Sequence, residues 1–281
     1  MNSPLADAVA TLLREVGEKT ILPRFGALAD SDIETKSGPT DFVTVADREA
    51  EQWLTPRLRR LVDCPVIGEE ACAENPAIRD AVAAPRAWTV DPVDGTSNFV
   101  KGNGRFCSMI ALLEYGVPVA SWIWVPLTET LYMATAGDGA MLVTPASRKK
   151  LQAGQGAMDL AKMAGGGNAL GISEPRRSHV RDALRQLPGR TFPGSSGILG
   201  ADIASGKQHF LFHGSCTPWD HAPVDLLCRE AGAHAAMVPD AAPFSADRNE
   251  PFLITTTPDD WQRVRAHVWG CLLYTSDAAD E

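Results

Sequence analysis

The chain has 281 residues, of which 44% are hydrophobic and 22% are charged, a balance typical of a globular protein with a sizeable core. Its formal net charge of -9 argues against a nucleic-acid partner, because binding to a phosphate backbone needs a basic face. Small anionic substrates remain compatible with this charge if a bound metal ion supplies local positive charge.

Cysteine spacing and apolar runs bear on the location of the protein. The six cysteines stand singly, without a C-x-x-C pair, which favours free thiols in a reducing compartment over disulfides or a zinc site. The N-terminal segment mixes acidic with apolar residues, unlike a signal peptide, and no run reaches the roughly eighteen apolar residues that a membrane span needs. We therefore expect a cytoplasmic protein without a membrane partner.

The first half of the chain reads as two helices followed by strands. Apolar spacing predicts a helix up to Val16, with Ser3 as N-cap and Pro4 at the first position, and a second helix over 46–61. The runs "CPVIGEE" and "RAWTV" resemble short strands that end in acid. From 105 to 144 the pattern is β-like, with turn signals at "YGVP" and "AGDGA".

The second half begins where the pattern loosens into glycine and small residues. We interpret "AGGG" at 164–167 as a weak linker signal, since no phosphate-loop motif is present. A helix is predicted near 175–187, a mixed stretch to 215, and another helix from near Asp220 to Gly232. There is no internal repeat. The predicted organisation is an α+β half, 1–150, followed by an α/β half, 151–270.

The last eleven residues, "CLLYTSDAADE", look foreign to the rest of the chain. They match one reading frame of a transposase adapter used to prepare sequencing libraries. We interpret 271–281 as a read-through scar after about Gly270 and leave it out of fold reasoning. The alternative is a genuine polar C-terminus, and the underlying codons distinguish the two.

Acidic residues gather in four short clusters. These are Asp41 and Asp47 in "TDFVTVADREAE", Glu69 and Glu70 in "VIGEE", Asp91 and Asp94 in "DPVDGT", and Asp220 in "PWDHA". Each has a purely structural interpretation. Thr44 and Asp47 fit a capping box, the glutamates fit a solvated strand end, and Pro92 and Gly95 fit a tight turn. Asp220 can simply cap its helix.

Taken together, the clusters indicate a metal site next to a phosphate site. Carboxylates gathered at strand ends repel one another unless a cation lies between them, and hard oxygen ligands select Mg²⁺ or a similar ion. In "DPVDGT" the carbonyl of Val93 is a further oxygen between Asp91 and Asp94. Gly95 lets the backbone approach a ligand, and the N–H groups of Gly95 and Thr96 at a helix start suit an anion.

At these segments the sequence resembles the inositol monophosphatases, within the lithium-sensitive, Mg²⁺-dependent phosphatase superfamily that includes fructose-1,6-bisphosphatase. The segments are "KSGPTDFVTVADREAE", "VIGEE", "DPVDGTSNF" and "WDHAPVDLLCREAGA", in family order and at family spacing. The likeness runs from about residue 5 to 265. It implies an α+β fold, a layered α-β-α-β-α sandwich.

The resemblance also implies a set of site residues. One Mg²⁺ ion would be held by Glu69, Asp91 and the Val93 carbonyl, and a second by Asp91, Asp94 and Asp220, with two or three ions per site. Glu69 and Thr96, with Asp47 behind Thr96, would act on a metal-activated water. The implied substrate-binding residues are Asp94, Gly95, Thr96, Ser196, His213 and Lys36. For Lys36, a solvated lysine is the alternative.

The implied function is Mg²⁺-dependent hydrolysis of a small phosphorylated alcohol, such as an inositol or sugar phosphate, with inhibition by lithium. Family members are often dimers, so the resemblance also implies a homodimer. The alternatives are another substrate of the superfamily (fructose bisphosphate, histidinol phosphate or a 3'-phosphonucleotide) and a catalytically dead binding module. A haloacid-dehalogenase-type phosphatase is excluded because "DPVDGT" has one residue too many between its aspartates. A serine hydrolase is excluded because "GSSGI" lacks the G-x-S-x-G spacing, and the absence of H-E-x-x-H argues against a zinc site.

The sequence departs from the family pattern in the W-D block, which also ends in "EAGA" rather than "EAGG", and at His213. Ala222, Pro223 and Val224 follow the W-D pair where the family has two small residues and a glycine, which should change helix packing more than metal ligands. His213 stands where inositol phosphatases carry a glutamate that contacts the sugar. It either alters specificity or packs into the core, so the substrate stays open.

Overall fold

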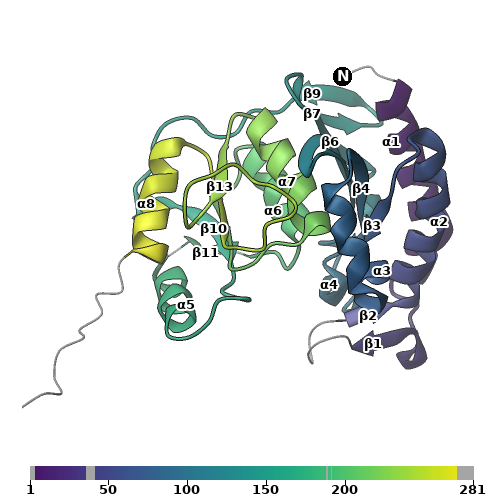
Figure 1. Cartoon of the computed structure of the whole chain (residues 1–281), viewed down its shortest axis with the longest axis horizontal. Coiled ribbons are helices and arrows are strands. Elements are labelled where there is room, and N and C mark those ends of the chain that lie inside the picture. The colour runs from purple at the N-terminus through teal and green to yellow at the C-terminus, as the bar shows by residue number, and fades with distance from the viewer. Residues whose placement is uncertain (1–3, 36–41, 188, 191, 271–281) are drawn as a thin grey trace, which may run out of the picture.

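The computed structural model describes residues 4–35, 42–187, 189–190 and 192–270, and its elements form five layers (Figure 1). Two helices cover one face of a seven-stranded sheet, two lie between this sheet and a five-stranded one, and two cover the outer face of the latter. In that order the helices are α1 (Pro4–Val16) and α2 (Val45–Leu61), α6 (Ser196–Ala204) and α7 (Pro218–Glu230), and α5 (Arg176–Gln186) and α8 (Pro258–Trp269). The predicted layered sandwich is confirmed.

The larger sheet has the strand order β3-β4-β5-β6-β7-β8-β9. Its strands are β3 (Val66–Gly68), β4 (Arg86–Asp94), β5 (Cys107–Glu114), β6 (Val117–Val125), β7 (Thr130–Thr135), β8 (Gly139–Thr144) and β9 (Ser147–Lys150). β3 and β4 are parallel, and the other neighbours are antiparallel. Trp88 and Val90 of β4 pack with α1 and α2, whereas Ala87 faces the central helices. This alternation follows from the two-residue period of a strand.

The smaller sheet has the order β11-β10-β12-β14-β13. Its strands are β10 (Ala164–Gly167), β11 (Gly189–Arg190), β12 (Phe210–His213), β13 (His234–Met237) and β14 (Phe252–Thr255). The interpretation of "AGGG" as a linker is therefore wrong, because it forms β10, parallel to β11 and β12. A Cβ atom on Gly165 or Gly167 would collide with the carbonyl oxygen of Phe210 or Phe212, so glycine here serves close strand packing.

The remaining elements are short. They are the hairpin β1 (Ile33–Thr35) and β2 (Phe42–Thr44), the helices α3 (Glu69–Glu74) and α4 (Thr96–Val100), a π-helical turn (Gly17–Ile21) and the 3-10 turns Leu22–Arg24, Asp30–Asp32, Pro76–Ala83, Pro126–Thr128 and Leu160–Lys162. Glu69 and Glu70 thus begin a helix, and Glu70 is buried, so the interpretation of both as a solvated strand end is wrong.

The predicted join near residue 150 coincides with a change of sheet. The first sheet ends at Lys150 and the second begins at Ala164, yet one apolar cluster contains residues of both sheets. The division into two domains stays a prediction. Within the described residues no helix is long and apolar enough to cross a membrane, and the five cysteines there are free thiols. Ser3, Lys36, Asp41 and residues 271–281 lie outside the described residues.

Candidate active site

Five of the predicted site residues lie at helix N-termini. Asp47 and Asp220 are the third residues of α2 and α7, and the first residues of three other helices are Glu69 (α3), Thr96 (α4) and Ser196 (α6). A helix N-terminus carries a partial positive charge, which favours carboxylates and phosphate groups nearby. The fold therefore offsets part of the cost of gathering acidic side chains.

Three carboxylates form the centre of the site. Asp91 and Asp94 at the end of β4 and Asp220 of α7 each offer an oxygen, and these oxygens lie within 4.8 Å of one another. Asp91 and Asp94 are buried. The site thus combines residues that are more than a hundred positions apart and come from the larger sheet and from the helix layer between the two sheets.

The electrostatics of the three carboxylates favour a bound cation. Burial, and then the charges of Glu69, Asp94 and Asp220, raise the pKa of Asp91 well above its usual range. Burial and Asp220 raise the pKa of Asp94 to about 7, although hydrogen bonds from Ser195 and two backbone N–H groups act in the opposite direction. An all-oxygen ligand set in a buried, mutually repelling arrangement fits a hard divalent cation such as Mg²⁺.

Asp94 is held by the N-terminal turn of α6. The Ser195 hydroxyl and the Gly197 N–H donate to Oδ2 of Asp94, the latter at 2.7 Å, and the Ser196 N–H donates to Oδ1 at 3.1 Å. The thiol of Cys107 also lies 3.4 Å from Oδ2. This network fixes the orientation of the carboxylate relative to the rest of the group.

Thr96 and Asp47 are joined as the resemblance implies. The Thr96 hydroxyl lies 3.2 Å from Oδ1 of Asp47 and 3.0 Å from the Val93 carbonyl oxygen. Oδ2 of Asp47 accepts hydrogen bonds from the Thr44 N–H at 2.9 Å and the Thr44 hydroxyl. The predicted capping box is confirmed. It also serves the site, because it fixes Asp47 beneath Thr96.

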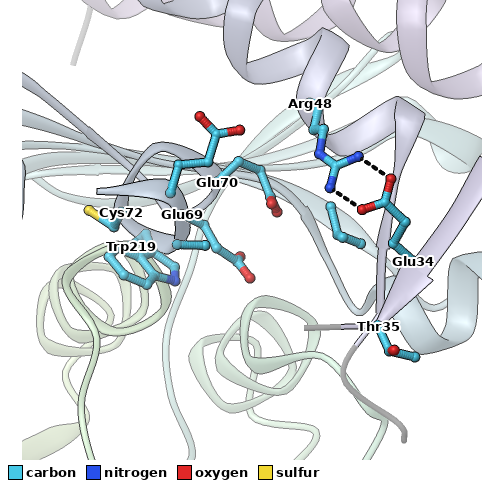
Figure 2. Close-up of a pocket in the computed structure, with 10 residues that line it drawn as sticks. Glu34, Thr35, Arg48, Glu69, Glu70, Cys72 and Trp219 are labelled. Atoms are coloured by element: carbon cyan, nitrogen blue, oxygen red, sulfur yellow. Dashed lines mark hydrogen bonds and ion pairs between the residues drawn. The ribbon is translucent and has the colours of Figure 1, made fainter. Parts of the chain in front are cut away.

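Glu69 lines a cavity of about 620 Å³ beside the carboxylate group. Figure 2 shows Glu69 and Glu70 projecting from α3, with Trp219 on one side and Arg48 and Glu34 on the other. The Arg48 guanidinium makes two hydrogen bonds to the Glu34 carboxylate, of 2.7 and 2.6 Å. Glu69 is not among the three carboxylates within 4.8 Å, but its charge is the largest neighbouring effect on Asp91.

Gly95 occupies the turn between β4 and α4. Its φ of +95° lies in the left-handed region, and a Cβ atom would meet the Arg105 carbonyl oxygen at 3.0 Å and the Ser195 Cβ at 3.1 Å. Both the conformation and the crowding require glycine. No hydrogen bond of the Gly95 or Thr96 N–H occurs within the described part of the chain.

His213 lies in the interior of the molecule. Only 4% of its surface is exposed, and its Nδ1 lies 2.7 Å from Nε2 of His221. Its ring contacts Phe192 edge to face. This position fits the packing alternative for His213. Its role as a substrate contact stays a prediction.

Several supporting residues escaped the sequence analysis. The carboxylate of Glu51 accepts hydrogen bonds from the Glu70 and Ala71 N–H groups at 2.8 and 2.9 Å and so caps α3. Glu51 follows Asp47 by four positions on α2, so helical spacing carried a signal for it. Ser195 had no comparable signal, because only the tertiary fold places Asp94 beside it. Thr217 stands three positions before Asp220, the spacing of a capping box, so its contact did carry a local signal.

Comparison with known proteins identifies the family. The model of the inositol monophosphatase family matches residues 1–250. The chain belongs to the inositol monophosphatase family. An inositol-1-monophosphatase of Rhizobium meliloti is 31% identical over 224 residues, which cover 76% of this chain and 78% of that protein. The 3'(2'),5'-bisphosphate nucleotidase CysQ of Escherichia coli is 29% identical over 237 residues, covering 82% and 89%.

Solved structures of the inositol monophosphatase family share the fold. The extragenic suppressor protein suhB of Bartonella henselae has a TM-score of 0.77 and 22% identity, over 96% of this chain and 100% of that one. An IMPase/NADP phosphatase complexed with Mg²⁺ and phosphate has a TM-score of 0.74 and 20% identity, over 93% of each chain. These relatives differ in their substrates, so family membership leaves the substrate of this phosphatase-family chain open.

Proposed function

We propose that the chain is an Mg²⁺-dependent phosphomonoesterase that hydrolyses a small phosphorylated alcohol, such as an inositol or sugar phosphate. The observation that carries this proposal is the meeting of Asp91, Asp94 and Asp220 within 4.8 Å, next to the hydrogen-bonded Thr96 and Asp47.

The residues divide into two overlapping ligand sets. Glu69, Asp91 and the Val93 carbonyl would hold one ion, and Asp91, Asp94 and Asp220 would hold the second. When bound, Mg²⁺ would supply positive charge to the phosphate oxygens and make water a better nucleophile. Asp91 belongs to both sets, which agrees with its position among Glu69, Asp94 and Asp220.

Thr96 and Glu69 would orient the attacking water and take up its proton. The single proton of the Thr96 hydroxyl is directed to Asp47 or to the Val93 carbonyl oxygen. The remaining lone pairs of that hydroxyl are then available to accept a hydrogen bond from water. Asp47 would hold Thr96 in this orientation, because its own position is fixed by Thr44.

The substrate would lie between the two halves of the molecule. The N–H groups of Gly95 and Thr96 suit the phosphate, and Asp94 and the first turn of α6 at Ser196 would face the alcohol. Lys36 is a further proposed contact. The names of the relatives favour an inositol or sugar phosphate, with a 3'-phosphonucleotide as the alternative that CysQ suggests. A homodimer and a cytoplasmic location stay predictions.

The test is phosphate release from a panel of inositol, sugar and nucleotide phosphates, with Mg²⁺ and with excess chelator. We expect Mg²⁺-dependent release from at least one small phosphomonoester. The absence of turnover on every substrate, with Mg²⁺ binding retained, would instead support a catalytically dead binding module.

A further inference from the structure

Two buried histidines form a contact behind the carboxylate group. His213 is the last residue of β12, and His221 is the fourth residue of α7, directly after Asp220. They are 4% and 3% exposed, and Nδ1 of His213 lies 2.7 Å from Nε2 of His221. The ring of Phe192 contacts His213 edge to face, and the ring of Phe252 contacts His221 in the same way. The phosphatase mechanism proposed above uses neither imidazole.

The hydrogen bonds around His221 indicate which nitrogen carries its proton. The Thr217 N–H donates to Nδ1 of His221 at 3.1 Å. Nδ1 also lies 3.0 Å from the Thr217 carbonyl oxygen, but a ring nitrogen that accepts from the Thr217 N–H has no proton to donate there. With Nδ1 accepting, His221 is protonated on Nε2 and donates to His213.

Thr217 connects this pair to the carboxylate group. It is the N-cap residue of α7, and its hydroxyl donates to Oδ2 of Asp220 at 2.6 Å. Its N–H is fixed by His221, and His221 is fixed in turn by His213. A continuous chain of hydrogen bonds therefore runs from β12 to Asp220. It fixes one oxygen of that carboxylate.

We infer that His213 and His221 are positioning residues, which hold Thr217 so that the Asp220 carboxylate is oriented for a divalent cation. This inference rests on the proposed function, since it concerns the same metal-ligand set. Residues that orient a metal ligand through a hydrogen bond typically contribute 10- to 100-fold to metal affinity. In this inference the pair acts through Thr217 and is not itself a metal ligand.

The test is calorimetric titration of the resting protein with Mg²⁺, without substrate. His221→Phe keeps an aromatic ring but removes the acceptor for the Thr217 N–H, so we expect affinity for Mg²⁺ to fall by about 10- to 100-fold. His221→Asn is the matched rescue, because its amide oxygen can take the place of Nδ1, and it should bind Mg²⁺ more tightly than His221→Phe. In steady-state kinetics, His221→Phe should need a higher Mg²⁺ concentration for half-maximal activity than His221→Asn. Its kcat at saturating Mg²⁺ should change less than its Mg²⁺ requirement.

A second pair of variants covers the case in which His221→Phe does not fold. Thr217→Val should lose Mg²⁺ affinity, and Thr217→Ser, which keeps the hydroxyl, should retain it. Wild-type affinity in folded His221→Phe or in Thr217→Val overturns the inference, as does equal loss in the two His221 variants. If the wild-type protein itself binds no Mg²⁺, the proposed function fails, and the inference fails with it.

Discussion

The hydroxyl of Ser195, the N-cap residue of α6, donates a hydrogen bond to the carboxylate of Asp94 at the end of β4. The same hydroxyl accepts the Ile198 N–H at 3.1 Å and so caps its own helix. One side chain thus completes a helix of the second half and orients a carboxylate of the first. The geometry of the carboxylate group therefore depends on the packing of the two halves against each other.

Ser195→Ala should weaken both functions of that hydroxyl. We expect the free energy of unfolding to fall by about 1 kcal/mol, the usual effect of losing an N-cap side chain, and the affinity for Mg²⁺ to fall as well. Denaturant unfolding and calorimetry measure the two effects. Ser196→Ala is the matched control for stability, because Ser196 contacts Asp94 through its backbone N–H. Equal effects of the two substitutions would contradict the assignment.

Asp91→Asn should reduce activity more than Asp47→Asn. Asp91 lies among Glu69, Asp94 and Asp220 and is proposed to contact both ions, so its loss removes metal binding itself. Asp47 orients Thr96, and loss of one assisted proton transfer typically costs about 10²- to 10⁴-fold in rate. Steady-state kinetics at several Mg²⁺ concentrations separate the two effects. Small and equal losses would mean that the metal ligands are wrongly assigned.

Phosphatase activity should require Mg²⁺ and should fall when lithium is added. The requirement is expected because the buried Asp91 and Asp94 meet Asp220 within 4.8 Å, an all-oxygen arrangement that suits a divalent cation. The resemblance to the family implies that lithium replaces the second ion and traps the product phosphate. Phosphate release is measured with Mg²⁺, with chelator, and with increasing lithium. Full turnover in excess chelator would exclude the metal mechanism.

Asp225 should make the stability of the protein fall as the pH rises. This side chain is fully buried in α7, and its Oδ2 accepts two hydrogen bonds from Arg229. Its Oδ1 has no hydrogen-bond partner among the residues that the structure describes. Burial raises its pKa to about 6 even though Arg229 acts to lower it. The folded state therefore keeps a proton that the unfolded state releases, and the stability that this proton contributes is lost as the pH rises from about 4 through about 6.

Thermal unfolding of the wild type and Asp225→Asn in metal-free buffer measures this effect. The melting temperature of the variant, relative to that of the wild type, should rise between pH 4.5 and pH 7. Above pH 7 the difference between the two should stay constant. Asp182→Asn, at an exposed position on α5, is the matched control. If the difference in melting temperature between the wild type and Asp225→Asn does not depend on pH, the Asp225 carboxyl is not the cause of the loss of stability.

The parts of the site that the sequence predicts correctly are local. The capping box of Thr44 and Asp47 spans three positions and follows from helix-start chemistry. Asp91 and Asp94 lie three apart at the end of one strand, so their proximity follows from spacing. Asp220 joins them across more than a hundred residues, and only the family resemblance indicated this before the structure was known.

The parts that could not be predicted depend on tertiary packing. "AGGG" has the composition of a linker, and only the approach of Phe210 and Phe212 shows why a strand needs glycine there. The bond between Ser195 and Asp94 joins residues 101 positions apart, and no periodicity indicates it. The contact of His213 with His221 also depends on how β12 meets α7, which the sequence pattern does not specify.

His213→Glu distinguishes the two interpretations of this position. A glutamate that contacted the sugar would change the order in which inositol 1-phosphate, a nucleoside monophosphate and a sugar bisphosphate are hydrolysed. In the structure, however, the side chain at position 213 is buried beside His221, Phe192 and Phe252, and the introduced glutamate would lie there. Burial of a charge there is costly, so we expect lower thermal stability and weaker Mg²⁺ binding with the order of the three substrates unchanged.

The measurements are kcat/KM for each substrate and the melting temperature. A reversed substrate order in a variant as stable as the wild type would make His213 a specificity residue and would contradict its role as a support for Asp220.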